Sequence, residues 1–130
     1  MKDFYDFAIE DLSTAEALWN LKINYDSIAY HTQQFCEKIL KYALLKELGE
    51  EVRGHKIVFL AKKLNNPEIL DMISDMRLIQ DFYFDKRYPS DEYMETTEEE
   101  LEIAFEVCHK LKIIIDNKYK NNKINKVEFK

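Results

Sequence analysis

The chain is nearly free of the two residues that most often interrupt regular structure, since it has two glycines and two prolines in 130 positions. Folds built from many short strands need glycine, proline and similar residues at their tight turns. Their scarcity argues against a β-sandwich or barrel and favours long helices. A chain of 130 residues has room for one domain with one hydrophobic core.

Composition and charge indicate a folded, acidic protein. Apolar residues make up 46% of the chain and charged residues 34%, which suits a buried core under a charged surface. The formal net charge of -6 argues against non-specific nucleic-acid binding by the whole molecule, so any such contact must be local. The N-terminal stretch is acidic where a signal peptide needs a basic start, and no apolar run approaches the ~20 residues of a membrane span. We therefore expect a cytoplasmic protein with no membrane segment.

Apolar residues recur at steps of three and four along five segments, the spacing typical of amphipathic helices. The expected helices cover residues 4–23, from Asp26 or Ser27 to Gly49, 57–64, from Pro67 to the loop KRYPSDEY, and 97–115. Thr97 and Glu100 form the sequence pattern of a capping box at the start of the last helix. The sequence thus predicts an all-α protein.

Metal and cofactor sites are not predicted. Cys36 and Cys108 lie far apart within apolar helical patterns, so we expect reduced thiols in the core rather than a disulfide or a metal pair. Glu106 and His109 show the Glu-x-x-His step of metal-binding bundles, but no second such step occurs in the first four segments. There is no glycine-rich phosphate loop, so a bound nucleotide would be held by side chains and helix ends.

The second expected helix carries a polar ridge within YHTQQFCEKILKYALL. Its residues lie three, four and seven positions apart and therefore share one helix face: Gln34, Glu37, Lys38 and Lys41. The ridge could contact phosphate groups. The alternative is that Glu37 and Lys41 form only a surface ion pair one turn apart.

Two further groups are suited to phosphate chemistry. Arg53 and His55 precede the short third helix, where histidine can exchange a proton near neutral pH and arginine cannot. The loop after the fourth helix places two cations beside an aromatic ring: Lys86, Arg87 and Tyr88. Such a group can pair with phosphate and stack on a base. The structural alternatives are a helix-start hydrogen bond for His55 and a rigid corner for the loop.

Four stretches, in this order, resemble the HEPN domain family: AIEDLSTAEAL, YHTQQFCEKILKYALL, GHKIVFLAKKL and DFYFDKRYP. The resemblance covers residues 4–118. It implies an up-and-down bundle of four long helices plus one short helix over residues 1–118. Residues 119–130 are polar and basic, and we expect them to be a mobile C-terminal tail.

The resemblance also implies a site and a function. Gln34, Glu37, Lys38 and Lys41 match the polar signature of the second helix, His55 matches the histidine that opens the short helix, and Arg87, Tyr88 and Pro89 match the exit of the fourth helix. Arg53 and Lys86 extend this nucleotide- or phosphate-binding set. The resemblance further implies a homodimer and a small nucleotidyltransferase partner, often in a toxin and antitoxin pair. The seventeen aromatic residues also favour a dimer, because a slim core cannot enclose all of them.

Two alternatives to a binding module remain open. Many HEPN proteins are metal-independent ribonucleases that use an arginine followed four to six residues later by a histidine, and no arginine here has that spacing. A ribonuclease with a different site would use His55 as acid or base and Arg87 to stabilise charge. The other alternative is a structural or small-ligand-binding bundle whose pocket uses aromatic residues near the fourth helix: Phe82, Tyr83, Phe84 and Tyr88.

Overall fold

A computed structural model of the chain describes residues 1–87 and 94–120, and for residues 83–87 it describes the backbone alone. The described residues form α-helices and one π-helical turn, with no strand among them. The elements are α1 (Phe4–Leu21), α2 (Tyr25–Leu48), α3 (Ile57–Leu64), α4 (Pro67–Leu70), α5 (Ile73–Arg87), α6 (Glu98–Ile115) and the turn η1 (Asp116–Lys120). The predicted all-α class is confirmed.

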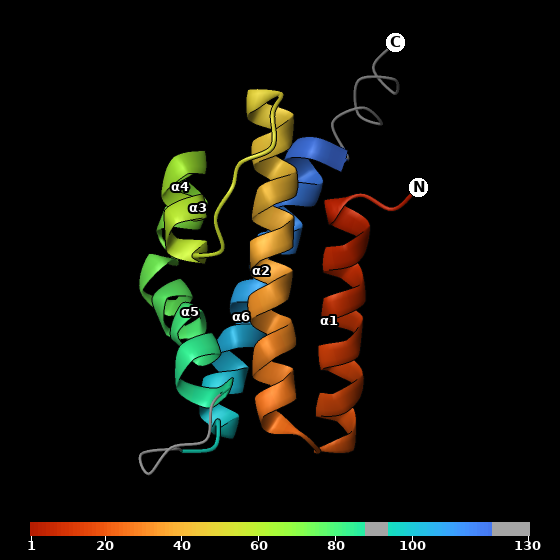
Figure 1. Cartoon of the computed structure of the whole chain (residues 1–130), viewed down its shortest axis with the longest axis vertical. Helices are drawn as coiled ribbons and strands as arrows, with labels where there is room; N and C mark the ends of the chain where they lie inside the picture. Colours follow the sequence, from red (N-terminus) through yellow and green to blue (C-terminus); the bar gives the residue numbers. More distant parts are fainter. Residues whose placement is uncertain (88–93, 121–130) are drawn as a thin grey trace.

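The long helices α1, α2, α5 and α6 run alternately down and up, as in an up-and-down bundle (Figure 1). α2 occupies the centre and packs against α1, α3, α5 and α6. A helix surrounded in this way buries most of its circumference, including polar positions. This placement explains why the charged side chains of Glu37 and Lys41 are buried.

The core consists of the apolar residues that recur at helical spacing. Each main helix contributes side chains that are less than a tenth exposed, such as Leu12, Ile39, Met76 and Leu111. Leu45, which continues the apolar pattern of α2, is instead 36% exposed. It lies one turn before the end of α2, and that end of the helix extends beyond the start of α1 (Figure 1).

Two helix boundaries differ from the sequence expectation. The fourth expected helix is split, because the amide of Met72 bonds to the carbonyl of Ile69, three residues back, at the break between α4 and α5. α2 begins at Tyr25, and Asp26 does not cap it. The Asp26 carboxylate instead accepts hydrogen bonds from the amide and hydroxyl of Thr96, at 3.0 and 2.8 Å. Asp26 thus joins the start of α2 to the segment before α6.

The two cysteines face each other between α2 and α6. Cys36 and Cys108 are both buried, and their sulfurs lie 3.9 Å apart without a bond between them. Burial, and then the neighbouring Cys36, raises the pKa of the Cys108 thiol well above its ordinary value. The Cys108 thiol therefore remains protonated, and both cysteines pack as small apolar side chains.

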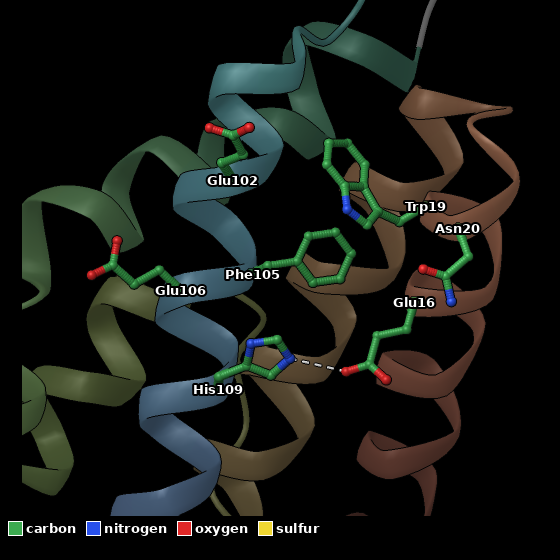
Figure 2. Close-up of a pocket in the computed structure, with 7 residues that line it drawn as sticks. All are labelled: Glu16, Trp19, Asn20, Glu102, Phe105, Glu106 and His109. Atoms are coloured by element: carbon green, nitrogen blue, oxygen red, sulfur yellow. Dashed lines mark hydrogen bonds and ion pairs between the residues drawn. The ribbon is translucent and has the colours of Figure 1, made fainter.

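α1 and α6 meet through side chains along one edge of the bundle (Figure 2). The rings of Trp19 and Phe105 lie 5.7 Å apart, and His109 lies 2.9 Å from the Glu16 carboxylate. η1 continues directly from α6, at the end of the bundle where α1 begins (Figure 1). Residues 121–130, most of the expected tail, lie outside the described residues. In the described residues no helix is both long enough and apolar enough to cross a membrane.

Candidate functional site

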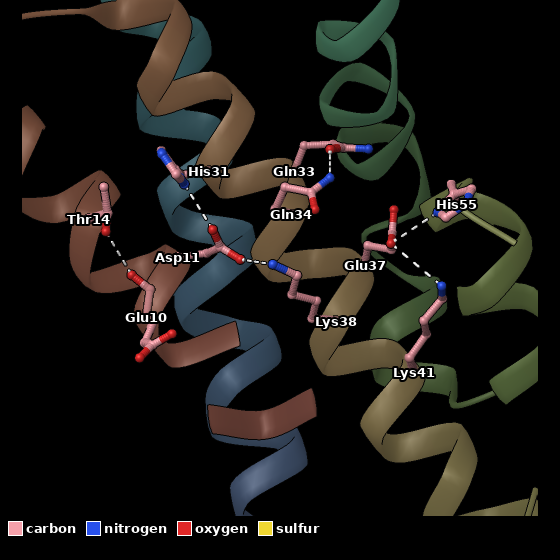
Figure 3. A network of polar contacts seen from close by, with 10 residues as sticks. All are labelled: Glu10, Asp11, Thr14, His31, Gln33, Gln34, Glu37, Lys38, Lys41 and His55. Carbon is pink, nitrogen blue, oxygen red and sulfur yellow. Dashed lines mark hydrogen bonds and ion pairs between the residues drawn. The ribbon is translucent and has the colours of Figure 1, made fainter. Parts of the chain in front are cut away.

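The polar residues of α2 divide between two buried carboxylates (Figure 3). The first is Asp11 of α1, which is 9% exposed. Its two oxygens lie 2.8 Å from His31 Nδ1 and 2.6 Å from Lys38 Nζ. His31 and Lys38 are two turns apart on α2, so both reach α1 from the same side. Asp11 therefore fixes the positions of two basic side chains.

The second carboxylate is Glu37 of α2. Its Oε2 atom lies 3.6 Å from Lys41 Nζ and 3.3 Å from His55 Nδ1. The side chains of Glu37 and Lys41 are 9% and 10% exposed, whereas that of His55 is 84% exposed. Glu37 and Lys41 do form the pair expected one turn apart, but it is buried rather than on the surface. Glu37 also links α2 to residues 49–56, the connector between α2 and α3, which contains His55.

Two glutamines lie between these carboxylates. Gln34 Nε2 donates to Gln33 Oε1 at 2.9 Å, and Gln33 is buried. We call the whole set the polar network: Asp11, His31, Gln33, Gln34, Glu37, Lys38, Lys41 and His55 (Figure 3). Within it, Lys38 pairs with Asp11 of α1, whereas Lys41 pairs with Glu37, which also contacts His55 of the connector. The predicted ridge is therefore divided between two carboxylates.

The connector before α3 adds exposed basic side chains. Arg53, His55 and Lys56 are all exposed, and Lys56 precedes the first residue of α3 without capping it through its side chain. The amide of Val58 donates to Gln80 Oε1 of α5 at 3.0 Å, which anchors this helix start. The positive end of the helix and the three basic residues together favour an anion.

The predicted group at the exit of the fourth expected helix lies largely outside the described residues. Lys86 and Arg87 belong to α5, but their side chains lie outside the described residues, as do Tyr88 and Pro89 entirely. The same holds for the side chains of the aromatic residues 83 and 84. Phe82 is 3% exposed and belongs to the core, so it does not line an open pocket.

The arrangement allows anion binding and proton exchange. Each histidine of the network has Nδ1 near a carboxylate, which leaves Nε2 as the nitrogen for exchange with a ligand. Among the side chains that the structure describes, no three from histidine, cysteine, aspartate or glutamate converge on a point that would hold a metal ion. Glu106 and His109 pair instead with Lys110 and Glu16, each at 2.9 Å.

A model of the HEPN domain matches residues 1–117. The chain belongs to the HEPN domain family. No curated protein and no solved structure matches the chain. Membership supports a nucleotide- or RNA-interacting module in general.

The sequence did not single out Asp11 and His31 as members of the site in this HEPN domain. A usable signal was present in α1, where Ala8, Asp11, Leu12 and Ala15 follow the spacing of one buried face. An acid on an apolar face needs a polar partner, because an unpaired buried charge is costly. The candidate partners are basic residues on the neighbouring helix, and His31 and Lys38 fill that role.

Proposed function

We propose that this HEPN domain acts in the cytoplasm as a nucleotide-binding interaction module. In this proposal the module forms a homodimer and is the partner of a small nucleotidyltransferase in a toxin–antitoxin type system. The observation that carries the proposal is the polar network, with the exposed connector beside it. Family membership supports the nucleotide or RNA ligand in general terms.

The charges of the network suit a phosphate at its exposed edge. Asp11 and Glu37 already balance Lys38 and Lys41, so these lysines are held in place but are largely neutralised. On the exposed connector, Arg53 and Lys56 have no ion pair among the described residues and can contact a phosphate directly. Side chains already fixed in position lose less freedom when a ligand binds. The network would therefore orient a nucleotide whose phosphates lie at the connector.

Calorimetric titration with ATP tests this site. We expect saturable binding, and we expect Arg53→Ala to weaken it by about tenfold, as for loss of a charge-assisted hydrogen bond. Lys62→Ala is the matched control, because it removes one exposed positive charge from the other end of α3. An unchanged affinity in Arg53→Ala, or an equal loss in Lys62→Ala, would contradict the proposed position of the phosphates.

The partner and the dimer need a separate experiment. The tagged chain would be isolated from its own host at native expression level, and co-purifying proteins would be identified by mass spectrometry. We expect a small nucleotidyltransferase in the isolate and a dimer in size analysis of the purified chain. A clean monomer at high concentration would refute the dimer, and an isolate without a nucleotidyltransferase would refute the partnership.

One observation favours a metal-independent ribonuclease as the second candidate. His55 is largely exposed and has its Nδ1 atom 3.3 Å from a buried carboxylate, an arrangement that suits an acid or base. Cleavage of RNA through the 2′-hydroxyl also needs stabilisation of the phosphorane charge, for which we propose Arg87. Lys38 or Lys41 would contact the phosphate. The absence of the usual spacing from arginine to histidine makes this candidate the weaker of the two.

An RNA-cleavage assay decides between the candidates. If the ribonuclease proposal holds, His55→Ala and Arg87→Ala each abolish cleavage while the circular dichroism of the helices is unchanged. Cleavage that survives both substitutions would remove these residues from the mechanism. No cleavage by the wild-type chain, together with saturable ATP binding, would support the non-catalytic module.

A further inference from the structure

A second candidate site lies away from the polar network, in a cavity of about 450 Å³ between α1 and α6 (Figure 2). This volume is within the range of small-molecule sites. Two aromatic residues and a histidine line it together with three acids, so its chemistry differs from that of the basic connector: Trp19, Phe105, His109, Glu16, Glu102 and Glu106.

The aromatic rings form one wall of the cavity. Trp19 and Phe105 lie 5.7 Å apart and are tilted by 51°, and Phe105 stacks against His109 at 6.0 Å. Trp19 already has a cation over its ring, because Lys22 Nζ lies 3.5 Å from the ring centroid. Aromatic faces attract cations through their quadrupole, tryptophan most strongly. The wall is therefore suited to an alkyl chain that carries positive charge.

The carboxylates lie on both sides of these rings. Glu16 comes from α1, and Glu102 and Glu106 come from α6. Glu16 pairs with His109 and Glu106 with Lys110, while Glu102 has no ion pair within the described part of the chain. The acids do not converge on one point as a metal site requires. Charges spaced apart around an apolar wall match a ligand whose own charges are spaced apart.

We propose that this cavity binds a linear aliphatic amine of the diamine and polyamine class. The alkyl chain lies over Trp19 and Phe105, and the ammonium groups pair with Glu16 and Glu102. The three carboxylates repel phosphate, so the nucleotide proposed above does not compete for this cavity. The site is thus independent of the polar network.

The chain reports on this cavity directly, because Trp19 is its single tryptophan. Titration with spermidine, followed by tryptophan fluorescence, should give a saturable change that calorimetry confirms at one ligand per chain. Butane-1,4-diol, which has no charge, should give no change. Glu102→Gln should weaken spermidine by about fivefold, as for loss of one exposed ion pair. Lys22→Gln should strengthen it, since it removes a competing cation from Trp19.

Glu68→Gln is the matched control, because it removes one exposed carboxylate from α4. It should leave spermidine affinity unchanged. Glu68→Gln and Glu102→Gln both change exposed side chains and should preserve the fold, which circular dichroism would verify. The proposal is overturned if wild type gives no saturable change. It is also overturned if Glu68→Gln weakens spermidine as much as Glu102→Gln does, because attraction to the net negative charge would then explain the binding.

Discussion

Asp11 lies among apolar neighbours on the buried face of α1, and two basic residues of α2 compensate its burial. A carboxylate removed from water loses hydration, and only close, well-placed partners restore that loss. His31 and Lys38 supply one contact to each oxygen. The residue therefore fixes how α1 sits on α2 as well as where two site side chains lie.

Replacing Asp11 with asparagine should destabilise the protein by about 2 kcal/mol. The substitution keeps the shape but removes the charge, and it leaves the partly buried Lys38 ammonium without a charged partner. Urea denaturation measures the change in the free energy of unfolding. Glu10→Gln is the control at the adjacent position, where an exposed acid pairs with Lys2, and it should cost less than about 0.5 kcal/mol. Equal costs would show that Asp11 is not a specific link.

The sequence alone predicted some of the individual residue contacts in the site. Helical spacing correctly placed Glu37 and Lys41 one turn apart, because that relation is local to α2. Spacing could not show that the pair is buried, since burial depends on the helices that surround α2. The contact of His31 with Asp11 could not be predicted either, because it depends on the register of α1 against α2.

Among the helices, the boundaries set by local chemistry were the predictable ones. The capping box of α6 is present as expected: Thr97 Oγ1 accepts from the amide of Glu100, and the Glu100 side chain accepts from the amide of Thr97. The start of α2 was not predicted, because the tertiary contact of Asp26 with Thr96 outweighs its use as a cap. Caps decided by neighbours in sequence can be predicted, whereas those decided by distant partners cannot.

Thr97→Ala should lower the free energy of unfolding by about 1 kcal/mol. The substitution removes the side-chain acceptor for an amide in the first turn of α6, which then has no partner in the helix. Thermal or urea denaturation would measure the loss. Thr14→Ala offers a contrast within α1, where the exposed hydroxyl only bonds back to the carbonyl of Glu10. Because alanine favours helix interiors, Thr14→Ala should cost nothing. A Thr97→Ala protein as stable as wild type would contradict the role of the cap.

Taken as a whole, the molecule is held together at one end by contacts between distant parts of the chain. Tyr5 of α1 donates to Asp116 at 2.7 Å, and Tyr119 of η1 donates to Glu47 of α2 at 2.6 Å. Lys118 lies 2.8 Å from the same Glu47 carboxylate. These contacts join α1, α2 and η1. The protonation states of the tyrosines and acids that make them therefore affect the stability of the whole fold and not only the local structure.

Alkaline pH should therefore destabilise the protein through two tyrosines. Burial, and then the hydrogen bond to Asp116, raises the pKa of Tyr5, and burial, followed by the bond to Glu47, raises that of Tyr119. In the unfolded chain both titrate near the ordinary value of about 10. A raised pKa in the folded state adds stability that is complete below pH ~10 and is lost as pH rises above it. The free energy of unfolding should fall above this pH.

Tyrosine-to-phenylalanine variants identify the groups responsible for this loss. Tyr5→Phe should be less stable than wild type at neutral pH but should lose less stability above pH ~10, because one linked group is gone.

Tyr119→Phe should change the pH dependence of stability at both alkaline and acid pH. Lys118, and then Tyr119, lowers the pKa of Glu47, which adds stability that is lost as pH falls through that lowered value. Without the Tyr119 hydroxyl, the loss of stability at acid pH should also be smaller. Denaturation curves from about pH 3 to about pH 12, which span the ordinary pKa values of carboxyl and tyrosyl groups, would measure the losses of stability at acid and at alkaline pH. If both losses are the same in the two variants as in wild type, neither tyrosine is linked to folding.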